Sequence, residues 1–200
     1  MSSLEGVALA VTSTFRFIVD QSAILMYPTI IESGANDLTQ GLLASDGVFT
    51  AARIMEDVRR NHDAMVALLT PLCPAFVIVG FFNLRSGYTQ AGPGADPVGL
   101  AADAAVAEHN AIQKAKYGFR FSDTQAIFMA DPSQTADDLV KHWPSVAIID
   151  PNTTNAGTGQ PGPVNIVHPT NYGHALMANG NAGGRGTIAI LQSQLAALPQ

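Results

Sequence analysis

Residues 76–82 read FVIVGFF, a run without a single charged or polar side chain. Such a run is typical of a strand in a parallel sheet, because helices cover both faces of the sheet. In residues 46–69, just before the run, apolar side chains recur at steps of three and four, which predicts an amphipathic helix. A helix leading into a buried strand is the unit of α/β folds, so we expect a parallel sheet. The predicted inner face of the helix comprises Ala51, Ile54, Met55, Val58, His62, Met65 and Leu69.

Further elements are predicted on both sides of this unit. Residues 23–31 form an apolar run, interrupted by Pro28, that predicts a strand. A helix from residue 97 is expected to end at Gly118, because glycine adopts the left-handed conformation that terminates helices. The remaining predicted elements are strands at residues 119–128 and 146–149 and helices near residue 171 and over 188–198.

The composition is that of one folded domain spanning residues 1–200. Hydrophobic residues make up 47% of the chain and charged residues 13%, so the chain can bury a substantial core. The formal net charge of −6, with no lysine or arginine cluster, argues against a nucleic-acid partner. No apolar stretch approaches the roughly 18 residues of a membrane span, and no secretory signal is recognised. We therefore expect a cytoplasmic location for the chain as given.

The sequence predicts no cofactor and no metal. Cys73 is the single cysteine, which excludes an internal disulfide, and its apolar surroundings predict a buried thiol. No cysteine and histidine grouping has the spacing of a metal site. An unrelated α/β domain of the flavodoxin type is disfavoured, because no glycine-rich phosphate loop follows the first predicted strand.

Two polar motifs carry the candidate chemistry. The first is GAND at residues 34–37, directly after the first predicted strand, and the second is HPTNYG at residues 168–173. Imidazole is the side chain best suited to proton transfer near neutral pH. A carboxamide held near a reacting carbonyl stabilises the negative charge that develops there. Ligands of α/β sheets bind outside the carboxyl ends of the strands, where we expect both motifs.

The order and spacing of these motifs resemble the third and fifth sequence blocks of the SGNH (GDSL-like) hydrolases. The match includes residues 77–83 and Asn110 between the two motifs and covers roughly residues 22–198. The resemblance implies a three-layer α/β/α fold around a flavodoxin-like parallel sheet. It also implies hydrolysis of a carboxylic ester, such as an acylated carbohydrate or a lipid.

The resemblance further implies roles for single residues. His168 would be the catalytic base, Asn36 an oxyanion donor, and Gly34 the tight turn that aims Asn36 into the site. The family has an aspartate three residues before the histidine, and Asn165 stands at that position here. An amide can hold the imidazole but cannot stabilise the imidazolium, and the same change in a serine protease lowers kcat about ten-thousand-fold.

The family's Gly-Asp-Ser block, which supplies the nucleophile, has no counterpart here. Ser13 and Ser22 precede Gly34 but lack a strand-to-helix turn, and the context of Gly6 does not match the second-block glycine. The chain is interpreted either as an N-terminally incomplete domain without its first strands or as a degenerate relative. We expect it to be inactive or impaired alone, and an open sheet edge predicts homo-oligomerisation. The alternative is a non-catalytic carbohydrate-binding or structural module.

Overall fold

A computed structural model describes residues 28–34, 37–38, 50–69, 75–83, 97–149 and 168–198. Its centre is a parallel sheet of β1 (Thr29–Ile31), β2 (Phe76–Val79) and β3 (Phe121–Ser122), in that spatial order. Thr29 pairs with Phe76, and Ile78 pairs with Phe121. Strands that follow one another along the chain are therefore neighbours in space, as expected when crossover helices join them.

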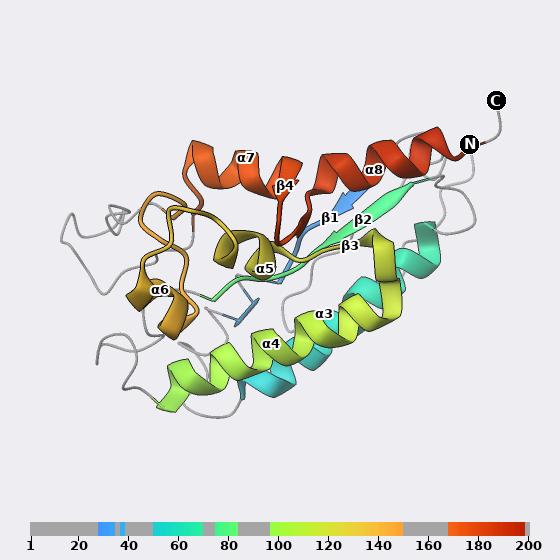
Figure 1. Ribbon diagram of the computed structural model, residues 1–200. Coiled ribbons are helices and arrows are strands. Elements are labelled where there is room, and N and C mark those ends of the chain that lie inside the picture. The colour runs from blue at the N-terminus through green and yellow to red at the C-terminus, as the bar shows by residue number, and fades with distance from the viewer. Residues whose placement is uncertain are drawn as a thin grey trace, which may run out of the picture.

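Helices cover both faces of this sheet (Figure 1). The two crossover helices, α3 (Ala51–Leu69) and α4 (Pro97–Tyr117), pack against each other on one side. On the other side α8 (Thr187–Ala196) packs against β2, and α7 (Asn171–Asn179) precedes it in the same layer. The described part of the chain is thus a mixed α/β structure around a small parallel sheet, which confirms the predicted α/β class.

Short elements complete the described structure, and their ends follow from local chemistry. Gly118, at φ +55°, ends α4 as predicted. The Asp123 side chain accepts a hydrogen bond from the Ala126 N–H at the start of the next helix, and Thr135 caps a second one. The short elements are η1 (Gly118–Arg120), α5 (Thr124–Met129), α6 (Ala136–Lys141) and the antiparallel pair β4 (Gly180–Asn181) and β5 (Gly184–Arg185).

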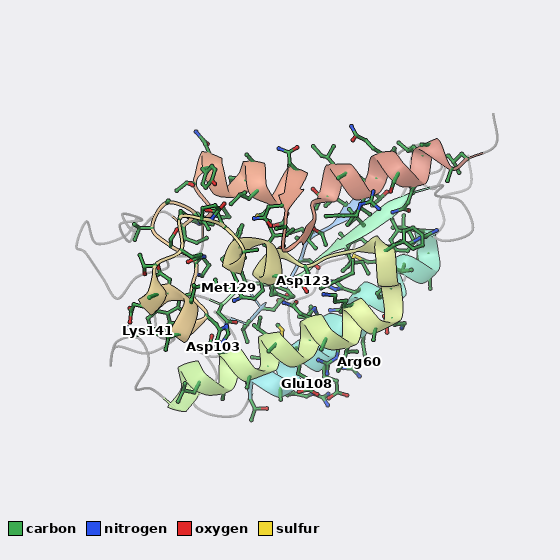
Figure 2. The ribbon with its side chains drawn as sticks, viewed as in Figure 1. Arg60, Asp103, Glu108, Asp123, Met129 and Lys141 are labelled. Atoms are coloured by element: carbon green, nitrogen blue, oxygen red, sulfur yellow. The ribbon has the colours of Figure 1, made fainter. Side chains whose placement is uncertain are left out.

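The inner face of α3 confirms the prediction from periodicity. Its buried residues are Ala51, Ile54, Met55, Val58, His62 and Leu69. The outer sides of the two crossover helices carry charge, and Arg60 and Glu108 are exposed there (Figure 2). Arg60 forms an ion pair with Asp57 of the same helix. This split of apolar and charged faces is what fixes the helices against the sheet.

Two strand predictions need correction. Residues 119–128 were expected to form one strand, but the strand covers only Phe121–Ser122 and residues 124–129 form α5. The Asp123 cap starts a helix there, and a helix buries Ile127 and Phe128 together. Residues 146–149 form a turn, with a single antiparallel bridge between Ile149 and Pro169 instead of a strand.

Other predictions stand as follows. The strand expected over residues 23–31 is described only as Thr29–Ile31, and the strand at 76–82 ends at Val79. The two C-terminal helices are confirmed as α7 and α8. Predictions for residues 1–27, Cys73 and residues 150–167 lie outside the described residues, so the expected open edge of the sheet stays a prediction. Of the helices that are described, none has the length and apolar character needed to cross a membrane.

Candidate functional site

Gly34 forms the turn that leaves the sheet at the carboxyl end of β1. Its φ is +104°, a conformation that side-chain-bearing residues rarely adopt. A β-carbon at this position would lie 2.7 and 2.8 Å from the two Val58 methyl carbons and 3.0 Å from Cζ of Phe81. Both backbone conformation and packing therefore require glycine. The Gly34 carbonyl accepts a hydrogen bond of 3.0 Å from the Leu38 N–H, which closes the turn.

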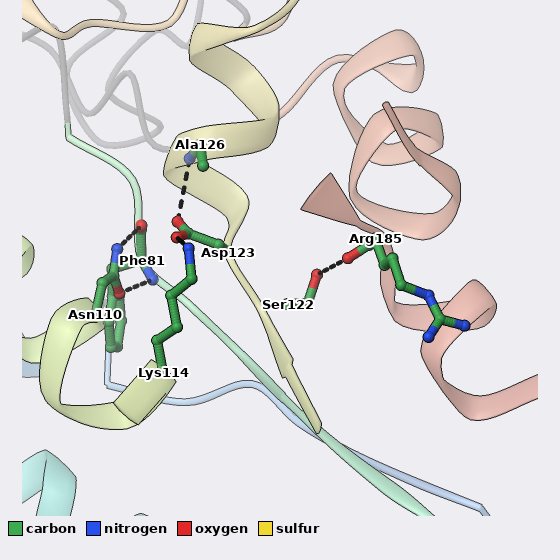
Figure 3. A network of polar contacts seen from close by, with 7 residues as sticks. All are labelled: Phe81, Asn110, Lys114, Ser122, Asp123, Ala126 and Arg185. Atoms are coloured by element: carbon green, nitrogen blue, oxygen red, sulfur yellow. Dashed lines mark hydrogen bonds and ion pairs between the residues drawn. The ribbon is translucent and has the colours of Figure 1, made fainter. Parts of the chain in front are cut away.

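The loop that follows β2 is held next to this turn. Asn110 of α4 accepts a hydrogen bond of 3.0 Å from the Phe81 N–H and donates one of 2.7 Å to the Phe81 carbonyl (Figure 3). The Gly80 N–H donates to the Ser122 carbonyl at 2.8 Å. The Asn83 N–H donates to the Gln125 side chain at 2.7 Å. Asn110, part of the family resemblance, thus has a structural task at the carboxyl end of β2.

Further polar contacts link α4 to the start of α5, and the end of β3 to β5. Lys114 pairs with the Asp123 carboxylate at 2.9 Å, and the Ser122 hydroxyl donates to the Arg185 carbonyl at 3.2 Å (Figure 3). Asp123 therefore serves both as helix cap and as ion-pair partner. These contacts hold the end of β3 and the start of α5 against α4 and β5.

His168 lies at the start of the segment that leads into α7. Its side chain is exposed, and no described residue forms a hydrogen bond or ion pair with its imidazole. Pro169, next to it, bridges to Ile149. The Thr170 hydroxyl donates to the Ala147 carbonyl at 2.7 Å and accepts from the Gly173 N–H at 3.1 Å, so it caps α7.

Close packing explains why residue 173 of the second motif is a glycine. A β-carbon there would lie 2.3 Å from the Ile148 carbonyl oxygen and 2.9 Å from Cβ of Pro169. The first turn of α7 therefore rests directly on the backbone at Ile148. Leu176 of α7 continues this contact in a core cluster that includes Ile148 and also Val79, the last residue of β2.

The first motif lies beside the loop that follows β2, because Gly34 packs against Phe81, two residues past the strand. The second motif leads into α7, whose Leu176 and Met177 share a core cluster with Val79, the last residue of β2. Figure 1 agrees, because the strands run toward the end of the molecule at which α7 begins. Asn36 and Asn165 lie outside the described residues, so their proposed contacts with a substrate and with His168 stay predictions.

A polar cluster beside Gly34 was not predicted. The Ser33 hydroxyl oxygen lies 3.1 Å from Nε2 of His62, a completely buried residue of α3. Nδ1 of the same ring lies 3.4 Å from Nε2 of Gln113, itself 1% exposed. The rings of His109 and His62 form a T-shaped pair, with ring centroids 5.7 Å apart. The available signal was a histidine on the apolar face of the predicted helix.

Burial keeps both histidines of this cluster neutral. It lowers the pKa of His62, against the opposing effects of the Ser33 carbonyl and the Asp63 carboxylate. Burial also lowers the pKa of His109 to about 3, and a proton on His62 and the positive charge of Arg59 act in the same direction. A neutral imidazole can accept a proton, which is the first requirement of a general base.

Asp63 follows His62 in the sequence but is occupied elsewhere. Its carboxylate accepts a hydrogen bond of 2.5 Å from the Tyr117 hydroxyl and pairs with Lys116 at 2.7 Å. Burial would raise the pKa of Asp63, but these two partners outweigh it and lower that pKa. The partner of the His62 ring is therefore a carboxamide. Among the described residues no three histidine, cysteine, aspartate or glutamate side chains gather as a metal site would require.

Comparisons of the chain with protein-family models, with curated proteins and with solved structures find no match.

Proposed function

We propose that this chain is an SGNH-type carboxylic-ester hydrolase domain whose site lies at the carboxyl ends of its parallel strands. The observation that carries the proposal is the position of the two motifs near the carboxyl end of β2. Gly34 of the N-terminal motif lies against Phe81, and α7, which follows the C-terminal motif, shares a core cluster with Val79. Ligands of parallel α/β sheets bind at this edge.

The strand order supports the same proposal. In a flavodoxin-like sheet the strands after the switch point follow one another outward, and the order β1-β2-β3 has that form. The motif glycines also have physical reasons to be glycine, as Gly34 and Gly173 both lack room for a β-carbon.

In the proposed chemistry, His168 transfers the proton and Asn36 stabilises the oxyanion. The imidazole accepts the proton of the attacking hydroxyl and returns it to the leaving alcohol. The Asn36 carboxamide donates a hydrogen bond to the carbonyl oxygen as it becomes negative, an interaction typically worth about 3–4 kcal/mol. Because Asn165 replaces an aspartate, we expect slow turnover of an acylated carbohydrate or lipid ester.

The test is hydrolysis of a chromogenic short-chain ester by the full chain and by His168→Ala. His174→Ala is the matched control, because His174 is also an exposed histidine at the start of α7. We expect His168→Ala to abolish hydrolysis, Asn36→Ala to lower it about 100-fold or more, and His174→Ala to leave it unchanged. Equal rates in His168→Ala and in the wild-type chain would overturn the role of His168, and no hydrolysis by the wild-type chain would favour a non-catalytic binding module.

A non-catalytic binding module is the second candidate. The observation that favours it is the exposed His168 ring, which has no carboxylate partner among the described residues. Such a module would bind an acylated glycan and release it unchanged. Calorimetric binding of an acylated oligosaccharide, together with an intact ester after prolonged incubation, would support this candidate over the enzyme.

A further inference from the structure

We propose that Ser33 and His62 form a nucleophile and base pair at the carboxyl end of β1. The Ser33 hydroxyl oxygen and Nε2 of His62 are 3.1 Å apart, within the range of a nucleophile bonded to its base. Ser33 is exposed, so a substrate can reach its hydroxyl, while His62 is completely buried behind it. This assignment rests on the proposed function for its substrate class, a carboxylic ester, but gives the role of base to His62 in place of His168.

Two elements that pack against each other, β1 and α3, set the position of the pair. Ser33 lies two residues after Ile31, so its side chain emerges from the same face of the strand, toward α3. Ile31 packs in a cluster with Leu69 and partly buried Met65 of α3, and His62 lies on the same face of that helix. Packing of β1 on α3 therefore sets the distance between hydroxyl and imidazole.

Gln113 is the positioning residue of this arrangement. Its carboxamide nitrogen lies 3.4 Å from Nδ1 of His62, and its oxygen is buried without a hydrogen-bond donor among the described residues. A half-turn of the amide exchanges these two atoms and lets Oε1 accept a hydrogen from Nδ1. That orientation leaves Nε2 of His62 without a hydrogen and free to accept the Ser33 proton.

With the ring hydrogen of His62 on Nε2 instead, the pair would be inert. Nε2 of His62 also lies 3.2 Å from the Ser33 carbonyl oxygen, to which a hydrogen on Nε2 could be donated. In that state Nδ1 accepts from the Gln113 nitrogen, and the imidazole merely ties α3 to the end of β1. The location of the single ring hydrogen therefore separates a base from a structural contact.

The proposed reaction conserves protons and forms one new bond at a time. The Ser33 oxygen attacks the ester carbonyl carbon while its proton passes to Nε2 of His62. The tetrahedral adduct collapses, the bond to the alcohol oxygen breaks, and His62 returns the proton to that oxygen. Water then attacks the acyl-serine, with His62 taking a water proton and returning it to Ser33, so that a carboxylic acid is released.

The experiment uses the full chain with a fluorophosphonate probe, followed by peptide mapping of the labelled serine. We expect the label on Ser33, with loss of fluoride. Ser33→Ala should remove the label, and His62→Gln should slow labelling at least about 100-fold. His109→Gln is the matched control, because it also replaces a completely buried histidine but one that does not contact Ser33. It should keep labelling if the fold is intact by circular dichroism.

A second measurement covers the case in which His62→Gln does not fold. The wild-type chain labelled with nitrogen-15 in its histidines reports the tautomer of His62 directly. A hydrogen on Nδ1 supports the pair, whereas a hydrogen on Nε2 overturns it. A label absent from the wild-type chain, or present on another serine, also overturns it.

The two proposals fail separately. Ester hydrolysis that persists in Ser33→Ala overturns the pair and leaves the proposed function intact. A labelled Ser33 in a chain that hydrolyses no ester supports the pair and overturns the proposed function. Labelling of Ser33 that persists in His168→Ala shows that the pair works without His168.

Discussion

Asn110 forms hydrogen bonds with both the N–H and the carbonyl of Phe81, so one carboxamide provides a partner for both backbone polar groups of that residue. Gln194 does the same for Phe76, with its oxygen 3.2 Å from the Phe76 nitrogen and its nitrogen 2.8 Å from the Phe76 oxygen. The two amides come from α4 and α8, on opposite faces of the sheet. The central strand is therefore held near each end by one helix of each layer.

Loss of the Asn110 carboxamide should destabilise the fold strongly. Asn110→Ala leaves the Phe81 N–H and carbonyl without these partners, at a cost of about 1–3 kcal/mol for each buried polar group. We expect the free energy of unfolding, measured with urea, to fall by about 2–4 kcal/mol. Glu108→Ala, on the exposed side of the same helix, is the control and should change it by less than about 0.5 kcal/mol. Equal effects of the two substitutions would contradict the role of Asn110.

Gly34 and Gly118 provide a matched pair for separating backbone strain from packing. Both have positive φ, +104° and +55°, but only Gly34 is enclosed, since no atom lies within 4 Å of a β-carbon built on Gly118. Gly118→Ala should cost about 1–2 kcal/mol from the left-handed conformation alone. Gly34→Ala should cost more, because its β-carbon collides with Val58 and Phe81. Thermal unfolding of both variants measures the difference, and a smaller loss for Gly34→Ala would contradict this packing.

Periodicity and apolar runs predicted most of the fold. The inner face of α3 and the buried strand β2 could be predicted because burial requires apolar side chains at many positions of one element, which leaves a repeated pattern in the sequence. The strand predicted at 119–128 was wrong because one residue, Asp123, caps a helix and ends the strand two residues after it starts. Local capping outweighed the apolar pattern there.

The candidate site could be predicted only in part. Gly34 and His168 were recognised from motifs, and Gly34 does form a turn that only glycine permits. The contact between Ser33 and His62 joins residues 29 positions apart, and no local pattern encodes it. The contact depends on how β1 packs on α3. Periodicity predicts that His62 lies on the inner face of its helix, but it does not predict that Ser33 lies within hydrogen-bond distance of it.

Asp103 should destabilise the folded chain at neutral pH. Burial raises the pKa of the Asp103 carboxyl (Figure 2) to about 6, although a hydrogen bond from the Trp143 side chain opposes this. Because the folded pKa lies above the unfolded value, the stability contribution is fully present below about pH 4 and is lost as the pH rises through about 6. Asp103→Asn should therefore be more stable than the wild-type chain at pH 8, by about 1–2 kcal/mol. Urea unfolding at pH 8 and pH 4 checks this, and an advantage that is larger at pH 4 would contradict it.

The buried histidines should make stability fall in the opposite pH direction. The folded pKa of His109 is about 3, below the value of about 6.5 expected in the unfolded chain, so its contribution is fully present above pH 6.5. It is lost progressively as the pH falls from 6.5 toward 3, by about 1.4 kcal/mol for each pH unit. His109→Gln carries no titrating ring, so between pH 7.5 and pH 5 the wild-type chain should lose about 2 kcal/mol more than this variant. Urea unfolding at the two pH values measures the difference. Since burial also lowers the pKa of His62 in the folded chain, the variant should keep a residual loss from that ring. Identical losses in variant and wild-type chain would mean that His109 is protonated in the folded state.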